Sequence, residues 1–158
     1  MVRYRSPGNG RGGVRLLVGV VLVSHLDLGL ALRRAAEMLL GPQERIATVS
    51  LQAQTAPDAL KAEVATAVAS LAGPAGVLVL ADLYGGSPEA AAVEAAADAP
   101  CAVEVLAGAN LPLLIAVLAQ RSSLPLGQLA SQARKAGREG LVHVPVAGRW
   151  PPAAASPS

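Results

Sequence analysis

Apolar segments alternate along the chain with alanine-rich and polar segments, a pattern typical of alternating strands and helices. The apolar runs over residues 14–23 and 76–81 lack a polar residue at every second position, so they predict strands that are buried on both faces. Shorter runs predict strands over residues 46–51, 102–106 and 141–145. Strands that alternate with helices favour an α/β fold, with a mainly parallel sheet and helices on both of its faces.

Helix signals fill the segments between these strands. In the second predicted helix, Leu60, Val64 and Val68 recur on one face, as in a helix that packs on a sheet. Gly41 is expected to end the first helix, and Asn110 to cap the fourth. The predicted helices span residues 27–40, 57–71, 87–97, 110–120 and 126–136.

The segment after the third predicted strand carries the first chemical signal. Gly85 and Gly86 allow a tight turn. Ser87 is a typical N-cap residue, and Pro88 suits the first helical position. A helix that starts in such a turn directs free backbone N–H groups at one point and carries about half a positive charge there. The turn therefore predicts an anion site at residues 85–87. Asp82, the first residue after the third predicted strand, is expected to lie beside this site.

His25 follows the first strand much as Asp82 follows the third. Ligands of parallel α/β sheets bind outside the carboxyl ends of the strands, so the two side chains meet if their strands are neighbours. Asp82 would then hold one imidazole nitrogen and leave the other facing the anion site. This arrangement suits a histidine that becomes phosphorylated, because phosphoryl transfer depends mainly on positioning and on charge stabilisation.

Composition narrows the class of protein. The 158 residues suit one domain with a sizeable core. A net charge of +2 and an aromatic content of 2% argue against a nucleic-acid surface. The single Cys101 excludes an internal disulfide, fits a reducing cytoplasm and is expected to be a buried structural thiol. Residues 1–12 and 147–158 are low in complexity and are expected to form flexible arms around a domain at residues 13–146.

Other kinds of site find no support in the sequence. The apolar run near the N-terminus is about half as long as a transmembrane span and carries Arg15. Because no cleavage site follows it, it is interpreted as a strand and not as a signal peptide. No His, Cys or carboxylate cluster has metal-ligand spacing, and no Walker or dinucleotide glycine pattern occurs, so neither a metal nor a cofactor is expected.

The remaining polar residues have simpler interpretations. Asp27 is expected to cap the first helix, with support of the loop near His25 as the alternative. For Asn110, a contact with the site from the end of the fourth strand explains the residue as well as capping does. His143 lies within the last predicted strand, where it is interpreted as an edge-strand side chain. Arg33, Arg34 and Arg45 are expected on a solvated face, with the docking of an acidic partner as the alternative.

Several blocks of the sequence resemble one known family in their order and spacing. The opening blocks are Val21-Leu22-Val23-Ser24-His25 and Ala35-Ala36-Glu37-Met38-Leu39, followed by Gly41. The later blocks are Gly76-Val77-Leu78-Val79-Leu80, Asp82-Leu83-Tyr84-Gly85-Gly86-Ser87-Pro88 and Gly108-Ala109-Asn110-Leu111-Pro112. Together they resemble the mannose/fructose-type enzyme IIA of the bacterial phosphoenolpyruvate-dependent sugar phosphotransferase system, over about residues 14–145.

The resemblance implies a phosphohistidine carrier. His25 would accept phosphate from the phosphocarrier protein HPr and pass it to a IIB component, with Asp82 orienting the imidazole and residues 85–87 binding the phosphate. The family fold is a doubly wound three-layer α/β sandwich with strand order 2-1-3-4. Its members are homodimers in which a C-terminal strand, here residues 141–144, pairs with the partner's sheet. Such a carrier is cytoplasmic and reaches the membrane only through the IIC and IID permease.

Two positions depart from the family's usual pattern and keep other functions open. Leu26 stands where the family usually has glycine, and it is expected to crowd HPr or to alter the turn. Glu89 and Ala90 replace a common Phe-Asn pair, and Glu89 is expected to favour the helix but to repel a phosphate. One alternative is a regulatory homologue that acts through protein interaction. The other is the phosphoryl donor subunit of a dihydroxyacetone kinase, which the Gly-Gly-Ser-Pro block disfavours.

Overall fold

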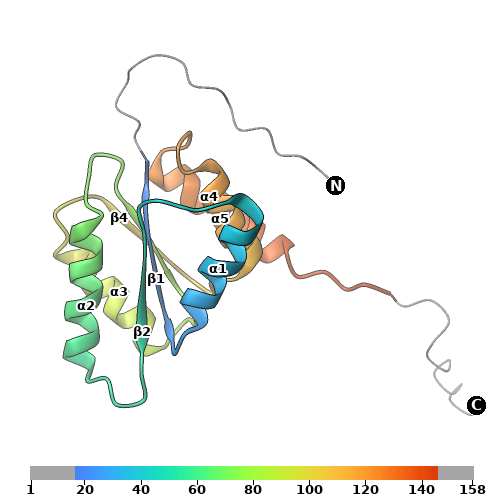
Figure 1. Ribbon diagram of the computed structural model, residues 1–158. Coiled ribbons are helices and arrows are strands. Elements are labelled where there is room, and N and C mark those ends of the chain that lie inside the picture. The colour runs from blue at the N-terminus through green and yellow to red at the C-terminus, as the bar shows by residue number, and fades with distance from the viewer. Residues whose placement is uncertain (1–16, 146–158) are drawn as a thin grey trace, which may run out of the picture.

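The chain folds into four strands and five helices in the computed structural model, which describes residues 17–145 (Figure 1). The strands are β1 (Gly19–His25), β2 (Ile46–Leu51), β3 (Val77–Ala81) and β4 (Val103–Ala107). The helices are α1 (Leu28–Leu40), α2 (Pro57–Ser70), α3 (Ser87–Ala97), α4 (Leu111–Gln120) and α5 (Leu126–Glu139). Within the described residues, none of the helices combines the length and the hydropathy that a membrane crossing requires.

All four strands run parallel in the order β2-β1-β3-β4, as expected for a doubly wound sheet. The register pairs Val23 of β1 with Ala81 of β3, so the carboxyl ends of these strands lie side by side. Figure 1 shows α2 and α3 on one face of the sheet, with α1, α4 and α5 on the other. The predicted α/β sandwich and its strand order are therefore confirmed.

Two apolar layers hold this sandwich together, one on each face of the sheet. Because side chains alternate along a strand, Val20 and Leu22 of β1 pack with α1, α4 and α5, while Val21 and Val23 pack with α2 and α3. These four side chains are at most 1% exposed. Burial on both faces explains why β1 and β3 are continuous apolar runs in the sequence.

The first strand begins later than its apolar run predicts. Pairing with β3 starts at Gly19, opposite Val77. Before that point the Val18 N–H donates to the carbonyl of Arg121 at 3.2 Å, so the backbone at Val18 does not yet pair with a neighbouring strand. The predicted strand residues 14–16 and the predicted arms at residues 1–12 and 147–158 lie outside the described residues.

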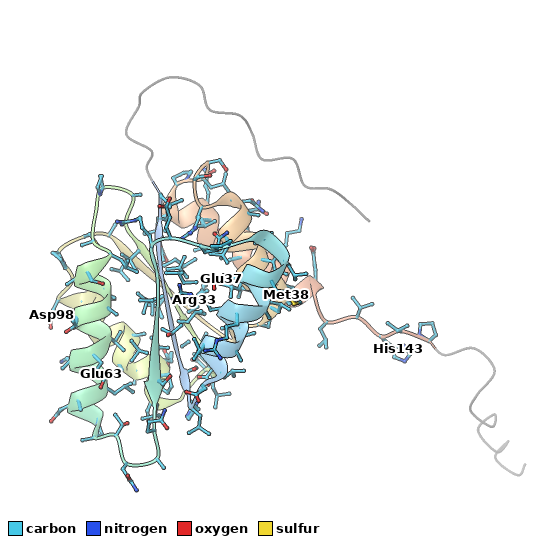
Figure 2. The ribbon with its side chains drawn as sticks, in the orientation of Figure 1. Arg33, Glu37, Met38, Glu63, Asp98 and His143 are labelled. Carbon is cyan, nitrogen blue, oxygen red and sulfur yellow. The ribbon has the colours of Figure 1, made fainter. Side chains whose placement is uncertain are left out.

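The predicted C-terminal strand is absent from the described part of the chain, where residues 141–145 are assigned to no strand. Leu141, Val142 and Val144 are 91%, 67% and 72% exposed. Figure 2 shows His143 on this segment, away from the sheet. The single chain therefore has no edge strand at residues 141–145 and His143 is not an edge-strand side chain in it, while the pairing of residues 141–144 with a partner's sheet stays a prediction.

Two of the three arginines that were expected on a solvated face are bound to the protein's own backbone. Arg33 donates to the carbonyl of Ile46 at 3.1 Å and pairs with Glu37 on α1 (Figure 2). Arg45 donates to two backbone carbonyls, at 3.2 Å and 2.6 Å. Arg34 is exposed, as expected. Arg33 therefore joins α1 to the start of β2, and Arg45 joins the segments before β1 and after α2.

Candidate functional site

The adjacency of β1 and β3 brings His25 and Asp82 into contact. Asp82 Oδ2 accepts the backbone N–H of His25 at 2.8 Å and lies 3.0 Å from Nδ1 of its imidazole. The backbone N–H of Asp82 donates in turn to the carbonyl of Val23 at 3.2 Å. The carboxylate is thus held in place by β1, the strand that carries the histidine.

Asp82 and His25 differ sharply in their exposure to solvent. The side chain of Asp82 is 7% exposed, whereas that of His25 is 46% exposed. An ionised carboxylate can only accept hydrogen bonds, so its contact selects the imidazole tautomer in which Nδ1 carries the proton. Nε2 then keeps its lone pair on an accessible ring. Asp82 Oδ1 is buried and has no hydrogen-bond partner among the described residues.

The turn that precedes α3 lies directly against the ring of His25. A Cβ atom placed on Gly86 would lie 3.4 Å from Cε1 of His25, in van der Waals contact with the ring. Gly85 has a φ of +75°, a conformation that side chains disfavour. The two glycines therefore bring the start of α3 next to the imidazole.

Ser87 does not cap α3, so that prediction is wrong. Gly86 occupies the N-cap position, and its carbonyl accepts the N–H of Ala90 at 3.1 Å as the first bond of the helix. Ser87 is therefore the first helical residue and makes no capping bond with its side chain. The extended backbone of Gly86, with φ −96° and ψ 168°, places the helix start one residue earlier than the serine suggested.

The turn offers two backbone donors beside His25. Within residues 17–145, the N–H groups of Gly86 and Ser87 have no protein acceptor. The N–H of Gly85 donates to Oε2 of Glu89 at 3.3 Å. Since the positive end of the α3 dipole lies at the same place, the turn can bind an anion with two free donors, while a third is occupied by a carboxylate.

Ser24 stabilises the loop between β1 and α1 in a way that the sequence reasoning missed. Its hydroxyl accepts the N–H of Gly29 at 2.7 Å and donates to the carbonyl of Leu26 at 3.4 Å. Asp27 holds the N-cap position but makes no capping bond with its side chain, so the predicted cap is wrong. The Ser24 hydroxyl lies five residues before the N–H of Gly29 that it accepts, because the loop reverses direction between them. The usual rules for helix capping do not include this spacing.

Leu26 adopts a backbone conformation that is unfavourable for a leucine. Its φ is +48°, in the left-handed region where a Cβ atom crowds the backbone. The strain is held in place by the bond from its N–H to the carbonyl of Leu51 at 2.8 Å. Glycine adopts this conformation without such a clash, which gives a physical reason for the glycine that the resemblance implies at this position.

Replacing Leu26 with glycine is expected to stabilise the protein by about 1 kcal/mol, because relief of the strain outweighs the added freedom of the unfolded chain. The side chain is 59% exposed, so little apolar burial is lost. Urea denaturation of the two proteins measures the difference. Leu83→Gly is the control, since Leu83 is similarly exposed but has no positive φ; it should bring no gain. A Leu26→Gly variant less stable than wild type would contradict the account.

The other polar candidates have structural roles. Asn110 Oδ1 accepts the N–H of Leu113 at 3.1 Å, which confirms that it caps α4. Its Nδ2 donates to the carbonyls of Gly108 and Gly137. Cys101, which was expected to be buried, is half-buried. It packs against the apolar layer between the sheet and helices α2 and α3. No three metal-ligating side chains of the described residues gather closely enough to hold an ion.

The sheet order and the His–Asp pair beside a helix start define the class of the protein: it has the fold of the IIA components of the sugar phosphotransferase system. Residues 19–134 match the family model described as "PTS system fructose IIA component". The chain belongs to this family, of the mannose type.

Solved structures of the same kind share the fold. A mannose/sorbose-specific IIA subunit of the phosphotransferase system from Enterococcus faecalis is 24% identical, with a TM-score of 0.71, and the match covers 84% of this chain and 98% of that one. The IIA protein associated with the fucose utilization operon of Streptococcus pneumoniae is 25% identical, with a TM-score of 0.71, covering 80% and 93%. The component EIIA from Streptococcus agalactiae is 22% identical, with a TM-score of 0.71, covering 80% and 97%.

Proposed function

We propose that this chain is a phosphohistidine carrier of a sugar phosphotransferase system, which accepts a phosphoryl group from HPr on His25 and passes it to a IIB component. The observation that carries the proposal is the 3.0 Å contact between Nδ1 of His25 and the buried Asp82. It leaves Nε2 as the nucleophile on an exposed ring that lies against the start of α3. Such a carrier works in the cytoplasm, where HPr supplies the phosphoryl group.

The residues of the site divide the reaction between them. The lone pair of Nε2 forms a bond to phosphorus while the bond from phosphorus to HPr breaks and leaves its electron pair on HPr. Nδ1 of His25 keeps its proton throughout, so the ring gains positive charge, which the carboxylate of Asp82 offsets. The N–H groups of Gly86 and Ser87 donate to the phosphoryl oxygens. Transfer to the IIB component repeats these steps in reverse.

Exposed apolar residues just after β1 and β3 support a protein as the source of the phosphoryl group. Leu26 lies in the loop after β1, Leu28 begins α1, and Leu83 and Tyr84 lie in the loop after β3. Their exposed fractions are 59%, 47%, 57% and 83%. Exposed apolar residues that gather around a reactive side chain mark an interaction site for another protein. HPr and the IIB component would bind here in turn, because both must reach His25.

The proposal is tested by incubating the protein with phosphoenolpyruvate, enzyme I and HPr and measuring its intact mass. One acid-labile phosphoryl group is expected. Because the chain has two histidines, fragment masses distinguish His25 from His143, and the group is expected on His25. No phosphorylation of the folded protein by a cognate HPr, or phosphorylation at His143, would overturn the proposal and favour a role in protein interaction without transfer.

A further inference from the structure

Glu89 points toward the helix start that carries the free N–H groups. It lies in the first turn of α3, and its Oε2 accepts the N–H of Gly85 at 3.3 Å. The bond spans four residues and closes over the glycine turn. A carboxylate in this place gains from the positive end of the helix dipole, which is the same field that would attract a phosphate.

The position of this carboxylate relative to His25 creates a conflict. Gly86, whose N–H is free, adjoins Gly85 and is the residue on which a Cβ would lie 3.4 Å from the imidazole. A phosphoryl group on Nε2 that reaches this turn therefore comes within a few ångströms of Glu89. Two negative groups at such a distance repel each other even in water, and both compete for the N–H of Gly85.

We propose that Glu89 is an internal competitor for the phosphate-binding turn, and that its carboxylate must leave Gly85 before a phosphoryl group on His25 gains all three donors of the turn. The inference rests on the proposed function, since it assigns this turn to the phosphoryl group. Glu89 sets how strongly the turn holds phosphate, and it touches no reacting atom. It thereby weakens the phosphorylated state and favours onward transfer.

Binding of inorganic phosphate to the unphosphorylated protein tests this without HPr. The probe is an NMR titration that follows the backbone amides of residues 85–87 in wild type, Glu89→Gln and Glu89→Ala. Glu89→Gln removes the charge but keeps an acceptor for Gly85, and it is expected to bind phosphate about fivefold more tightly, as for one charge–charge contact at a few ångströms. Glu89→Ala also frees the N–H of Gly85. On phosphate binding, the chemical shift of the Gly85 amide should therefore change more in Glu89→Ala than in Glu89→Gln.

Glu63→Gln is the matched control, because Glu63 is an exposed residue of α2 (Figure 2) and its replacement changes the net charge equally. It should bind phosphate as wild type does. Equal affinities in wild type and both Glu89 variants would overturn the inference, and so would the absence of any shift at residues 85–87. The proposed function fails by a different result, the lack of phosphorylation by HPr, so the two failures are distinguishable.

Discussion

Replacing Asp82 with asparagine is expected to lower the rate of His25 phosphorylation by HPr about a hundredfold, which corresponds to about 3 kcal/mol. The reason is the charge that develops on the imidazole. Nδ1 keeps its proton while Nε2 bonds to phosphorus, and the carboxylate 3.0 Å away stabilises the resulting cation. An amide is neutral, and its carbonyl can replace Oδ2 as an acceptor without supplying that charge.

The geometry around His25 should change little in Asp82→Asn, so a lower rate of phosphorylation reports the loss of the negative charge. The amide carbonyl can accept the backbone N–H of His25, as Oδ2 does at 2.8 Å in wild type. The NH₂ group then takes the place of Oδ1, which is buried and has no hydrogen-bond partner within residues 17–145. Placing an unsatisfied donor there costs about 1–3 kcal/mol of folding stability, so urea denaturation should accompany the kinetics.

The rate is measured by quench-flow and intact mass, with two further variants as controls. Asp27→Asn removes the same charge from the exposed loop that follows His25, where the carboxylate makes no capping bond, and should keep the wild-type rate. His25→Gln sets the background. A folded Asp82→Asn variant that is phosphorylated as fast as wild type would show that the carboxylate has no part in the transfer.

The fold class and the places of His25 and Asp82 at strand ends could be predicted because both depend on local patterns. Continuous apolar runs mark strands that are buried on both faces, and β1 and β3 are such runs. Polar residues directly after these runs must lie at the carboxyl edge of a parallel sheet. The remaining step, that β1 and β3 are neighbours, came from the family's strand order, since no pattern within the chain specifies it.

What could not be predicted depends on the path of the backbone between these elements. The helix begins at Ser87 because Gly86 is extended, and Ser24 binds the N–H of Gly29 because its loop curls back. The side-chain direction of Glu89 is likewise set by the turn it closes. The strand expected at residues 141–145 was predicted to pair with a partner's sheet, so the single chain does not test that pairing.

Arg121 was also missed, because its partners are backbone carbonyls and one side chain that lie far from it in sequence. It is 2% exposed although it ends α4. One nitrogen, Nη2, donates to the carbonyl of Glu44 at 2.6 Å and to Oε1 of Gln43 at 3.1 Å. The other, Nη1, donates to the carbonyls of Arg45 and Val18 at 3.2 Å and 3.5 Å. The guanidinium therefore joins the loop before β2 to the residue before β1.

Replacing Arg121 with methionine is expected to reduce the free energy of unfolding by about 3 kcal/mol, because carbonyls that now accept from the guanidinium lose their donors while buried. Burial lowers the pKa of Arg121 to about 10, so the group is still charged at neutral pH and its bonds are charge-assisted. Methionine fills much of the same volume, which limits any cavity. Urea denaturation measures the loss, with Arg34→Met as the control on the exposed face of α1. A loss below about 1 kcal/mol would mean that desolvating the charge offsets most of what its four hydrogen bonds contribute.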